Sequence, residues 1–318
     1  MRNLGKSHWF GIIYGIMLAA FTAYALLDVF VIPHRYETAL PASQAVDGAS
    51  ASESGSAPTN EADDAPDDAA AEKKSTDTEY ADGNITISVK TLREDDTDIY
   101  VADVELSSAE YLKTALAENT YGRNVKESTS AIAQENNAIL AINGDFYGSR
   151  LNGYVIRNGV LYRSSAAKGN EDLVIYADGS LGIIEESEIS AEALLDKGAQ
   201  QVLSFGPALI ENGDISVSES EEVGKAKASN PRTAIGLIND LHYVFVVSDG
   251  RTSASKGLSL YELARFMKSL GVKTAYNLDG GGSSTMYYQG RVINNPTTDG
   301  RTISERRVSD IVYIGYGK

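Results

Sequence analysis

The first 80 residues constrain the fold most, because a long apolar segment is followed directly by one that cannot form a core. Residues 9–33, WFGIIYGIMLAAFTAYALLDVFVIP, contain one charged residue, Asp28. About 20 helical residues span a bilayer, so we expect a transmembrane helix here. Residues 34–80 are dominated by alanine, serine, aspartate and glutamate, which bury too little apolar surface to offset chain entropy. The globular fold is therefore expected in residues 81–318, after an acidic disordered linker over 34–80.

The charges around the apolar segment predict its orientation. Arg2 and Lys6 precede it, which by the positive-inside rule places residues 1–8 in the cytoplasm and the remaining chain outside. A cleaved signal peptide is the alternative, because Ala23-Tyr24-Ala25 fits a small-x-small cleavage site. The apolar run continues well past that site, so we favour a retained signal anchor over 9–33. The expected localisation is the cell membrane, with a single pass and an extracellular domain.

The composition excludes several classes of function. The sequence has no cysteine, and so no disulfide, thiolate nucleophile or cysteine-ligated metal site. The formal net charge is -16, and an acidic surface is repelled by phosphate backbones, so no nucleic acid partner is expected. Residues 81–318 hold 23 lysines and arginines against 32 aspartates and glutamates, so the linker carries much of the acidity. We interpret its acid clusters as a solvated spacer rather than a cation site.

Residues 81–318 are expected to form a single α+β domain, with a mixed, largely antiparallel sheet and packed helices. Alternating apolar residues predict strands from residue 85 onward. Strands over 232–238 and 242–248 are expected to pair, the second in a central position because it is nearly all apolar. Helices are expected near 108–118, 127–136 and 258–270. Four turn pairs predict hairpins: Asn158-Gly159, Asp178-Gly179, Asn212-Gly213 and Gln289-Gly290.

Carboxylates are the candidates for acid-base chemistry. His8 and His34 flank the apolar segment and His242 stands alone at a strand start, so Ser-His-Asp triads and histidine metal sites are not expected. Polar clusters follow four predicted strands, and converging strand ends are how a sheet presents a site. Asp145 or Asp279 taken singly could be a plain turn residue, but the four clusters taken together favour a carboxylate-and-arginine site. The clusters are Asn143, Asp145 and Tyr147; Asn230, Arg232 and Thr233; Ser248, Asp249 and Arg251; and Asn277 with Asp279.

The stretch after Asp279 is Gly280-Gly281-Gly282-Ser283-Ser284-Thr285, and three consecutive glycines are unfavourable inside a strand or helix. It lacks the Gly-Lys-Ser/Thr ending of a P-loop, and it does not open a helix as a dinucleotide-binding loop does. What remains is a loop of amide donors and hydroxyls suited to an anion such as phosphate. A plain glycine-rich turn between two strands is the alternative.

Several of these motifs occur in an order that resembles the phosphodiester glycosidase family, which includes many bacterial envelope proteins. The resemblance covers about residues 84–316, and its most specific part is Asn277 to Ser284. Asp145 departs from the family pattern, which more often has a small residue there. The motifs are Asn143 to Tyr147, Pro231 to Gly236, Ser248 to Arg251, Leu258 to Met267, Asn277 to Thr285 and Arg306 to Ser309.

The resemblance implies hydrolysis of a sugar-1-phosphodiester at the anomeric carbon. The expected export and tethering suggest a cell-envelope or exopolysaccharide glycan as the substrate. Because the leaving group is a phosphomonoester, it needs charge stabilisation more than a strong acid. Asp279 or Asp249 would activate water or steady the oxocarbenium-like centre, and Glu262 is a third catalytic candidate, with a helix ion pair as its alternative role. The expected substrate-binding residues are Asn143, Asp145, Arg232, Thr233, Arg251, Asn277, Gly280, Gly281, Gly282, Ser283, Ser284 and Arg307.

Within this set, Arg232, Ser283, Ser284 and the loop amides would hold the phosphate, and Arg307 would be a second anion contact. Asn143 and Asn277 would orient sugar hydroxyls. No cofactor is expected to be required, although Asp249 and Asp279 could ligate calcium or magnesium through oxygen. Two other functions stay open: a non-catalytic envelope protein that binds anionic glycopolymers, and a metal-dependent phosphoesterase.

Overall fold

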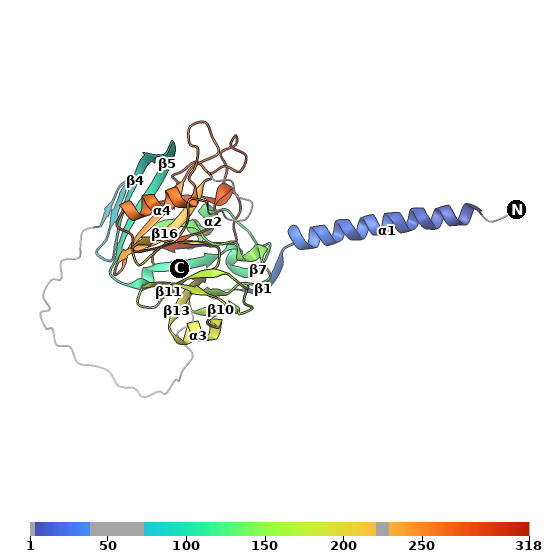
Figure 1. Cartoon of the computed structure of the whole chain (residues 1–318), viewed down its shortest axis with the longest axis horizontal. Coiled ribbons are helices and arrows are strands. Elements are labelled where there is room, and N and C mark those ends of the chain that lie inside the picture. The colour runs from blue at the N-terminus through green and yellow to red at the C-terminus, as the bar shows by residue number, and fades with distance from the viewer. Residues whose placement is uncertain (1–3, 39–72, 221–228, 318) are drawn as a thin grey trace, which may run out of the picture.

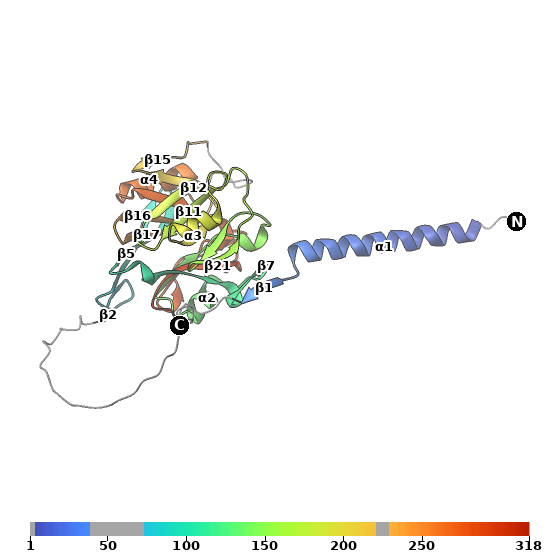
Figure 2. The ribbon, with the colours of Figure 1, turned by 90° about the horizontal axis from the view of Figure 1, so that it is seen from below.

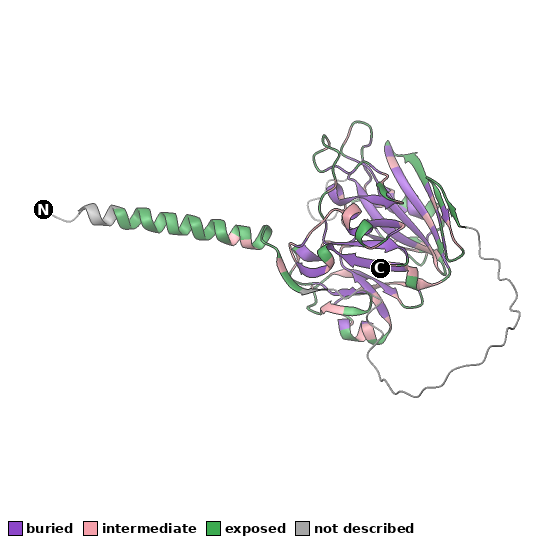
Figure 3. Cartoon of the chain, turned by 180° about the vertical axis from the view of Figure 1, so that it is seen from behind, coloured by how far each residue is buried: buried purple, intermediate pink, exposed green. Residues whose placement is uncertain are grey.

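The computed structural model describes residues 4–38, 73–220 and 229–317. A long helix, α1 (Leu4–Phe30), projects from the domain that carries the other described elements (Figure 1). Its segment Trp9–Phe30 has a mean hydropathy of 2.0, and none of it is buried within the protein; Figure 3 colours most of this segment as exposed. By length and composition α1 can cross a membrane, a property that it would share with a signal sequence.

The largest sheet has nine strands, and each described pair of neighbours in it is antiparallel. Its order is β15 (Asp214–Ile215), β14 (Ala208–Glu211), β18 (Thr274–Asn277), β16 (Arg232–Asn239), β17 (His242–Ser248), β5 (Thr97–Leu106), β4 (Ile85–Glu94), β3 (Glu79–Ala81) and β2 (Lys74–Ser75).

In the described part of the chain, two further sheets have five strands each and are antiparallel, and a fourth sheet is a two-stranded pair of β1 (His34–Thr38) and β7 (Thr120–Arg123). One five-stranded sheet has the order β10 (Val160–Arg163), β9 (Val155–Arg157), β13 (Ala199–Leu203), β11 (Glu171–Tyr176) and β12 (Leu181–Glu185). The other five-stranded sheet has the order β20 (Arg291–Val292), β19 (Met286–Tyr288), β8 (Leu140–Asn143), β21 (Asp310–Ile314) and β6 (Leu112–Leu116).

The core lies between the three larger sheets, and the helices cover their outer faces. Along β17, Tyr243, Phe245 and Val247 point into a cluster shared with both five-stranded sheets. Val244 and Val246 pack on the opposite face beneath α4 (Leu260–Ser269). This confirms that β17 is central and that the domain is a single α+β unit. α2 (Thr129–Glu135) and α3 (Ala191–Asp196) each cover the outer face of one five-stranded sheet.

The predicted hairpins are confirmed, because each turn pair joins two strands that pair with each other. They connect β9 to β10, β11 to β12, β14 to β15 and β19 to β20. In the first, Asn158 and Gly159 have φ of 51° and 75°, the left-handed conformation that a two-residue hairpin turn requires.

The helix predicted over 108–118 is wrong. Ser108 does cap a short 3-10 turn, Ala109–Tyr111, by accepting a hydrogen bond from the Glu110 amide. The chain then enters β6, which pairs with β21 along its whole length. Pairing with a strand near the other end of the domain sequence overrides the local preference. The helices predicted over 127–136 and 258–270 are confirmed as α2 and α4.

The acidic linker predicted over 34–80 is wrong at both of its ends. β1 (His34–Thr38) pairs with β7 (Thr120–Arg123), and Figures 1 and 2 both place this pair at the end of α1. At the other end, β2 and β3 extend the nine-stranded sheet. Backbone pairing holds these residues despite their polar composition. Residues 39–72 of the predicted linker lie outside the described residues.

Candidate active site

A pocket of about 180 Å³ opens where several strands end. Arg232 begins β16, Arg251 follows β17, and Asp279 follows β18. The volume is below the roughly 300–1,000 Å³ of pockets that enclose drug-sized ligands, so this pocket fits a small group or the end of a larger molecule. The lining residues are Phe205, Asn230, Arg232, Arg251, Asp279, Gly280, Gly281 and Arg306.

Asp279 is the carboxylate among these lining residues, and its side chain is 16% exposed. Its Oδ2 accepts a hydrogen bond of 2.7 Å from the Ser283 hydroxyl and one of 3.1 Å from Arg306 Nη2. Ser283 in turn accepts a bond of 2.8 Å from Arg306 Nε. Burial raises the pKa of the Asp279 carboxyl, and Arg306 and Ser283 oppose that rise. The site thus holds an oriented carboxyl that takes up protons more readily than an ordinary aspartate.

The pocket is positively charged, since Arg232, Arg251 and Arg306 face one carboxylate. Burial lowers the pKa of Arg251, and repulsion from Arg306 lowers it further. Burial and Arg306 likewise lower the pKa of Lys126, against the attraction of Asp279. Like charges held this close are stabilised by an anion, and guanidinium groups suit the oxygens of phosphate.

The amide cradle predicted after Asp279 is not formed, because most loop amides donate within the protein. The amides of Gly281, Ser283 and Ser284 donate to Pro231, Gly280 and Gly281 carbonyls. The Ser284 hydroxyl is buried without a hydrogen-bond partner among the described residues. Arginine side chains, rather than loop amides, therefore supply the positive charge of the pocket.

The three glycines instead allow close packing around Asp279. A Cβ on Gly280 would lie 2.9 Å from the Pro231 carbonyl oxygen, and one on Gly282 would overlap the Thr298 hydroxyl. Gly281 has φ of 63°, and a Cβ there would lie 2.8 Å from Arg251 Nη2. A side chain at any of these three positions would therefore displace Arg251, Pro231 or Thr298.

Asn143 and Thr233 are brought to the site, as predicted, but their side chains hold the loop from behind. Asn143 Nδ2 donates 2.6 Å to the Asp279 carbonyl, and its Oδ1 accepts from the Thr233 hydroxyl and the Thr285 amide. The bonding capacity of Asn143 is thus used internally, which does not fit contact with sugar hydroxyls. Asn277 is also buried, and its Nδ2 donates 2.7 Å to the Gly206 carbonyl.

Asp249 does not fit the predicted catalytic role. Its two oxygens accept hydrogen bonds from the Tyr100 hydroxyl, the Asn294 side chain, and the amide and side chain of Asn295. Asp249 is buried and does not line the pocket. This carboxylate anchors the loop after β20.

Glu262 also has a structural role, different from the ion pair considered as its alternative. Ser259 and Glu262 form a capping box at the start of α4, in which Glu262 Oε2 accepts a bond of 2.7 Å from the Ser259 amide. Such a pair satisfies two amides that the helix leaves free.

We therefore expect Glu262→Ala to lower the free energy of unfolding by about 0.5–1 kcal/mol. Denaturant unfolding measures this loss. Any activity of the pocket at Asp279 should stay within about twofold of wild type, because neither Ser259 nor Glu262 lines that pocket. A loss of activity at unchanged stability would contradict this assignment.

Arg307 was predicted as an anion contact, but its neighbour Arg306 lines the pocket. Arg306 Nη2 also donates 2.9 Å to the Gly280 carbonyl, whereas Arg307 is exposed and outside the pocket lining. Phe205 and Arg306 were not among the predicted site residues. Asn230, a member of a predicted polar cluster, also lines the pocket, and its Oδ1 accepts two bonds from Arg251.

Asp145 is buried beneath the site instead of lining it. Its Oδ2 lies 3.0 Å from Arg157 Nη2, which is also 2.7 Å from Asp310 Oδ2. Burial and the neighbouring Asp145 raise the pKa of Asp310 to about 8, while Arg157 opposes that rise. The triad supports η4 (Tyr147–Ser149), because the Tyr147 amide donates to Asp145 Oδ1.

Of the described residues, one group of three has carboxylate or histidine atoms close enough together to share a metal ion. It comprises Asp103, Glu105 and His242. These side chains come from β5 and β17, and none of them lines the pocket at Asp279. His242 Nε2 donates a hydrogen bond of 2.9 Å to Asp103 Oδ1.

The sequence is similar to several known proteins. SPbeta prophage-derived uncharacterized protein YomE of Bacillus subtilis (strain 168) is 32% identical over 203 residues, covering 62% of this chain and 31% of YomE. N-acetylglucosamine-1-phosphodiester alpha-N-acetylglucosaminidase of Mus musculus is 32% identical over 196 residues, covering 55% of this chain and 37% of the enzyme. The chain thus spans about a third of the length of these curated relatives.

The fold is similar to a solved structure of the zebrafish N-acetylglucosamine-1-phosphodiester alpha-N-acetylglucosaminidase catalytic domain, auto-inhibited by its pro-peptide. The TM-score is 0.58 at 22% identity, covering 73% of this chain and 83% of that one. A hypothetical protein from Synechocystis has a TM-score of 0.50 at 16% identity, covering 73% of this chain and 62% of that one. At these identities the likeness concerns the fold.

The sequence profile of phosphodiester glycosidases matches residues 136–315, which is more than half of the chain. The matched range contains each residue that lines the pocket at Asp279. The chain belongs to the phosphodiester glycosidase family.

Proposed function

We propose that the chain hydrolyses a sugar-1-phosphodiester at the anomeric carbon, giving free sugar and a phosphomonoester. The observation that carries this proposal is the convergence of Arg232, Arg251 and Arg306 on one pocket with a single lining carboxylate, Asp279. Membership of the family supports a hydrolase of this kind.

In the proposed reaction the arginines bind the phosphate and stabilise the charge that it gains. A water molecule attacks the anomeric carbon and gives one proton to Asp279. The bond between that carbon and the bridging oxygen breaks, and its electron pair leaves on the phosphomonoester. This leaving group has a second pKa of about 6, so it departs with little help from an acid. Ser283 and Arg306 hold the Asp279 carboxyl in position, through the bonds described above.

The proposed location is the outer side of a membrane, with α1 as a retained anchor and residues 1–8 in the cytoplasm. The length and hydropathy of α1 support a membrane span, and Arg2 and Lys6 support this orientation. We propose a phosphodiester-linked glycan of the cell envelope or an exopolysaccharide as substrate.

The test is to incubate the purified full chain in neutral detergent with a UDP-sugar or a p-nitrophenyl sugar phosphodiester. Release of free sugar and phosphomonoester is expected. In heavy-oxygen water the label should enter the sugar, because the carbon–oxygen bond breaks. Label in the phosphate together with loss of activity in chelator would indicate a metal-dependent phosphoesterase. Binding without turnover on a panel of sugar phosphodiesters would indicate a glycopolymer-binding protein.

Arg306→Gln is expected to lower kcat/KM by roughly 10- to 100-fold, because a charged partner of the phosphate and of Asp279 is lost. Arg306 also lowers the pKa of Asp279, so the acid limb of the pH–kcat/KM profile should move to higher pH. Arg307→Gln is the matched control and should keep the wild-type rate and profile. Equal losses in both variants would contradict the assignment of Arg306.

A further inference from the structure

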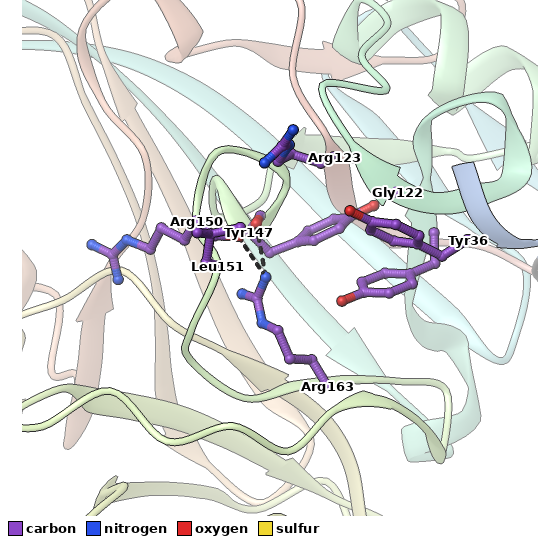
Figure 4. Close-up of a pocket in the computed structure, with 8 residues that line it drawn as sticks. Tyr36, Gly122, Arg123, Tyr147, Arg150, Leu151 and Arg163 are labelled. Carbon is purple, nitrogen blue, oxygen red and sulfur yellow. Dashed lines mark hydrogen bonds between the residues drawn. The ribbon is translucent and has the colours of Figure 1, made fainter. Parts of the chain in front are cut away.

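A second pocket, of about 80 Å³, lies where α1 meets the domain. It shares no lining residue with the pocket at Asp279. Its residues come from β1, β7, η4, the loop after η4, and β10, and Figure 4 shows how they lie. They are Tyr36, Tyr121, Gly122, Arg123, Tyr147, Arg150, Leu151 and Arg163.

Tyrosine rings form one wall of this second pocket. The ring of Tyr121 stacks on that of Tyr147 with centres 5.5 Å apart, and its centre lies 5.7 Å from that of Tyr36. Since Tyr36 belongs to β1, the segment that follows α1 completes the pocket. Asn124, just after β7, also donates to the carbonyls of Val29 and Ile32.

Three buried polar atoms of the lining residues have no aligned hydrogen bond to any part of the chain that the structure describes. They are Arg123 Nε, the Tyr147 hydroxyl and Arg163 Nη2. Tyr147 is 1% exposed. The Tyr121 hydroxyl lies beside the Arg163 guanidinium, whose charge opposes the rise in the Tyr121 pKa that burial causes. Buried donors without partners are costly, so their gathering in one pocket indicates a ligand with acceptor oxygens.

The second pocket also carries positive charge that the chain only partly neutralises. Arg163 is held by carbonyls, with Nε 2.6 Å from Gly153 O and Nη1 2.8 Å from Arg150 O. No described carboxylate lies within ion-pair distance of Arg163. Arg123 Nη2 is 3.5 Å from Asp28 Oδ2 and 2.9 Å from His34 Nε2. An anion is therefore favoured over a neutral ligand.

Arg150 lines the second pocket, but its charged end points away from the tyrosines (Figure 4). Its guanidinium lies over the Phe146 ring, 4.2 Å from the centre, and Nη1 is 3.4 Å from the Ser204 carbonyl. Arg150 therefore provides a control for Arg163, because both arginines line the second pocket and only the charge of Arg150 points away from it.

We propose that the second pocket binds a phosphodiester group, and that its source is the headgroup of a membrane lipid. The small volume fits one such group, with the rest of the molecule outside. Tyr36 and Leu151 at the rim are 58% and 70% exposed, and aromatic and apolar side chains beside arginine are typical of protein surfaces at the headgroup level. The lipid source rests on the proposal that α1 spans the membrane; the phosphate chemistry does not.

The test uses the full chain in neutral detergent, titrated by calorimetry with dihexanoyl phosphatidylglycerol and, separately, with inorganic phosphate. Tyr147→Phe keeps the ring and removes the hydroxyl, and Arg163→Gln removes the charge. Each is expected to weaken lipid binding by about tenfold or more. Arg150→Gln should bind as wild type. Arg306→Gln should also keep this binding, which separates it from any phosphate bound near Asp279.

Tighter binding of the lipid than of inorganic phosphate in wild type, lost in Tyr147→Phe, supports the lipid source. Equal affinity for both probes, again lost in Tyr147→Phe, would overturn the lipid source. Unchanged affinity for both probes in Tyr147→Phe and in Arg163→Gln would overturn the site itself. Hydrolysis of a soluble sugar phosphodiester is measured in parallel, so failure of the proposed reaction is distinguishable from failure of the second pocket. Tyr147→Phe decides the outcome should Arg163→Gln not fold.

Discussion

Asp279→Asn is expected to lower kcat/KM for a sugar-1-phosphodiester by roughly 10²- to 10⁴-fold, the range for loss of a positioned acid-base group. Asparagine keeps the shape of the side chain and can still accept from Ser283 and Arg306. It cannot take a proton from water. Steady-state kinetics with a p-nitrophenyl sugar phosphodiester measure this loss, while substrate affinity should change little because the arginines remain.

The pH dependence of the activity provides a second test of the role of Asp279 as the base. If it is the base, activity rises with pH as the carboxyl loses its proton, and the limb lies above the ordinary aspartate value of about 3.9 because burial raises the pKa. The limb should be absent from the residual activity of Asp279→Asn. Asp249→Asn is the comparison, since Asp249 lies outside the pocket lining. Wild-type turnover in Asp279→Asn would rule out the proposed mechanism.

Arg157→Leu is expected to lower the free energy of unfolding by about 3–5 kcal/mol. The side chain is 2% exposed, and it is paired with Asp145 and Asp310. Its Nη1 also donates to the carbonyls of Ile156 and Val202. Leucine would leave two carboxyls buried next to each other without a cation. Urea or guanidinium unfolding of both proteins gives the difference directly.

A surface arginine serves as the control for this stability prediction. Arg93 pairs with Asp98 at 2.7 Å, but its side chain is 53% exposed. Exposed pairs contribute about 0–1 kcal/mol, so Arg93→Leu should be nearly neutral. Similar losses in Arg93→Leu and Arg157→Leu would contradict the argument from burial. Because the Arg157 triad lies beneath Asp279, some loss of activity is also expected in Arg157→Leu.

The sequence predicts local features of this fold, such as turns and helix caps, better than contacts between residues that are far apart in the sequence. Turn pairs such as Asn158-Gly159 determine hairpins through their own backbone preferences, and α4 is determined by its apolar face and its cap. β6 was predicted as a helix because its partner β21 lies far along the chain. The same limit applies to Asp249, whose role depends on contacts with Tyr100, Asn294 and Asn295.

The site follows the same pattern. Arg232, Arg251 and Asp279 could be predicted because strands that pair bring their ends together. The choice between Arg306 and Arg307 could not, because adjacent side chains of an extended chain point to opposite sides, and nothing in residues 300–308 determines which side faces the pocket. A glycine run suggests exposed amide donors, so the sequence predicts that the loop amides bind phosphate. Their partners, such as the Pro231 carbonyl, become visible only in the fold.

On the proposal that α1 spans a membrane, the pairing of β1 with β7 determines how far the pocket at Asp279 stands from the bilayer. Both ends of the acidic segment are fixed to the domain, at β1 and at β2. Residues 31–33 are the connection between α1 and β1. The length of residues 39–72 therefore does not set the distance between the pocket and the end of α1, whereas an insertion between Phe30 and His34 would change it. On the proposal that α1 is a retained anchor, a membrane-bound substrate would meet the pocket at a fixed height above the end of α1.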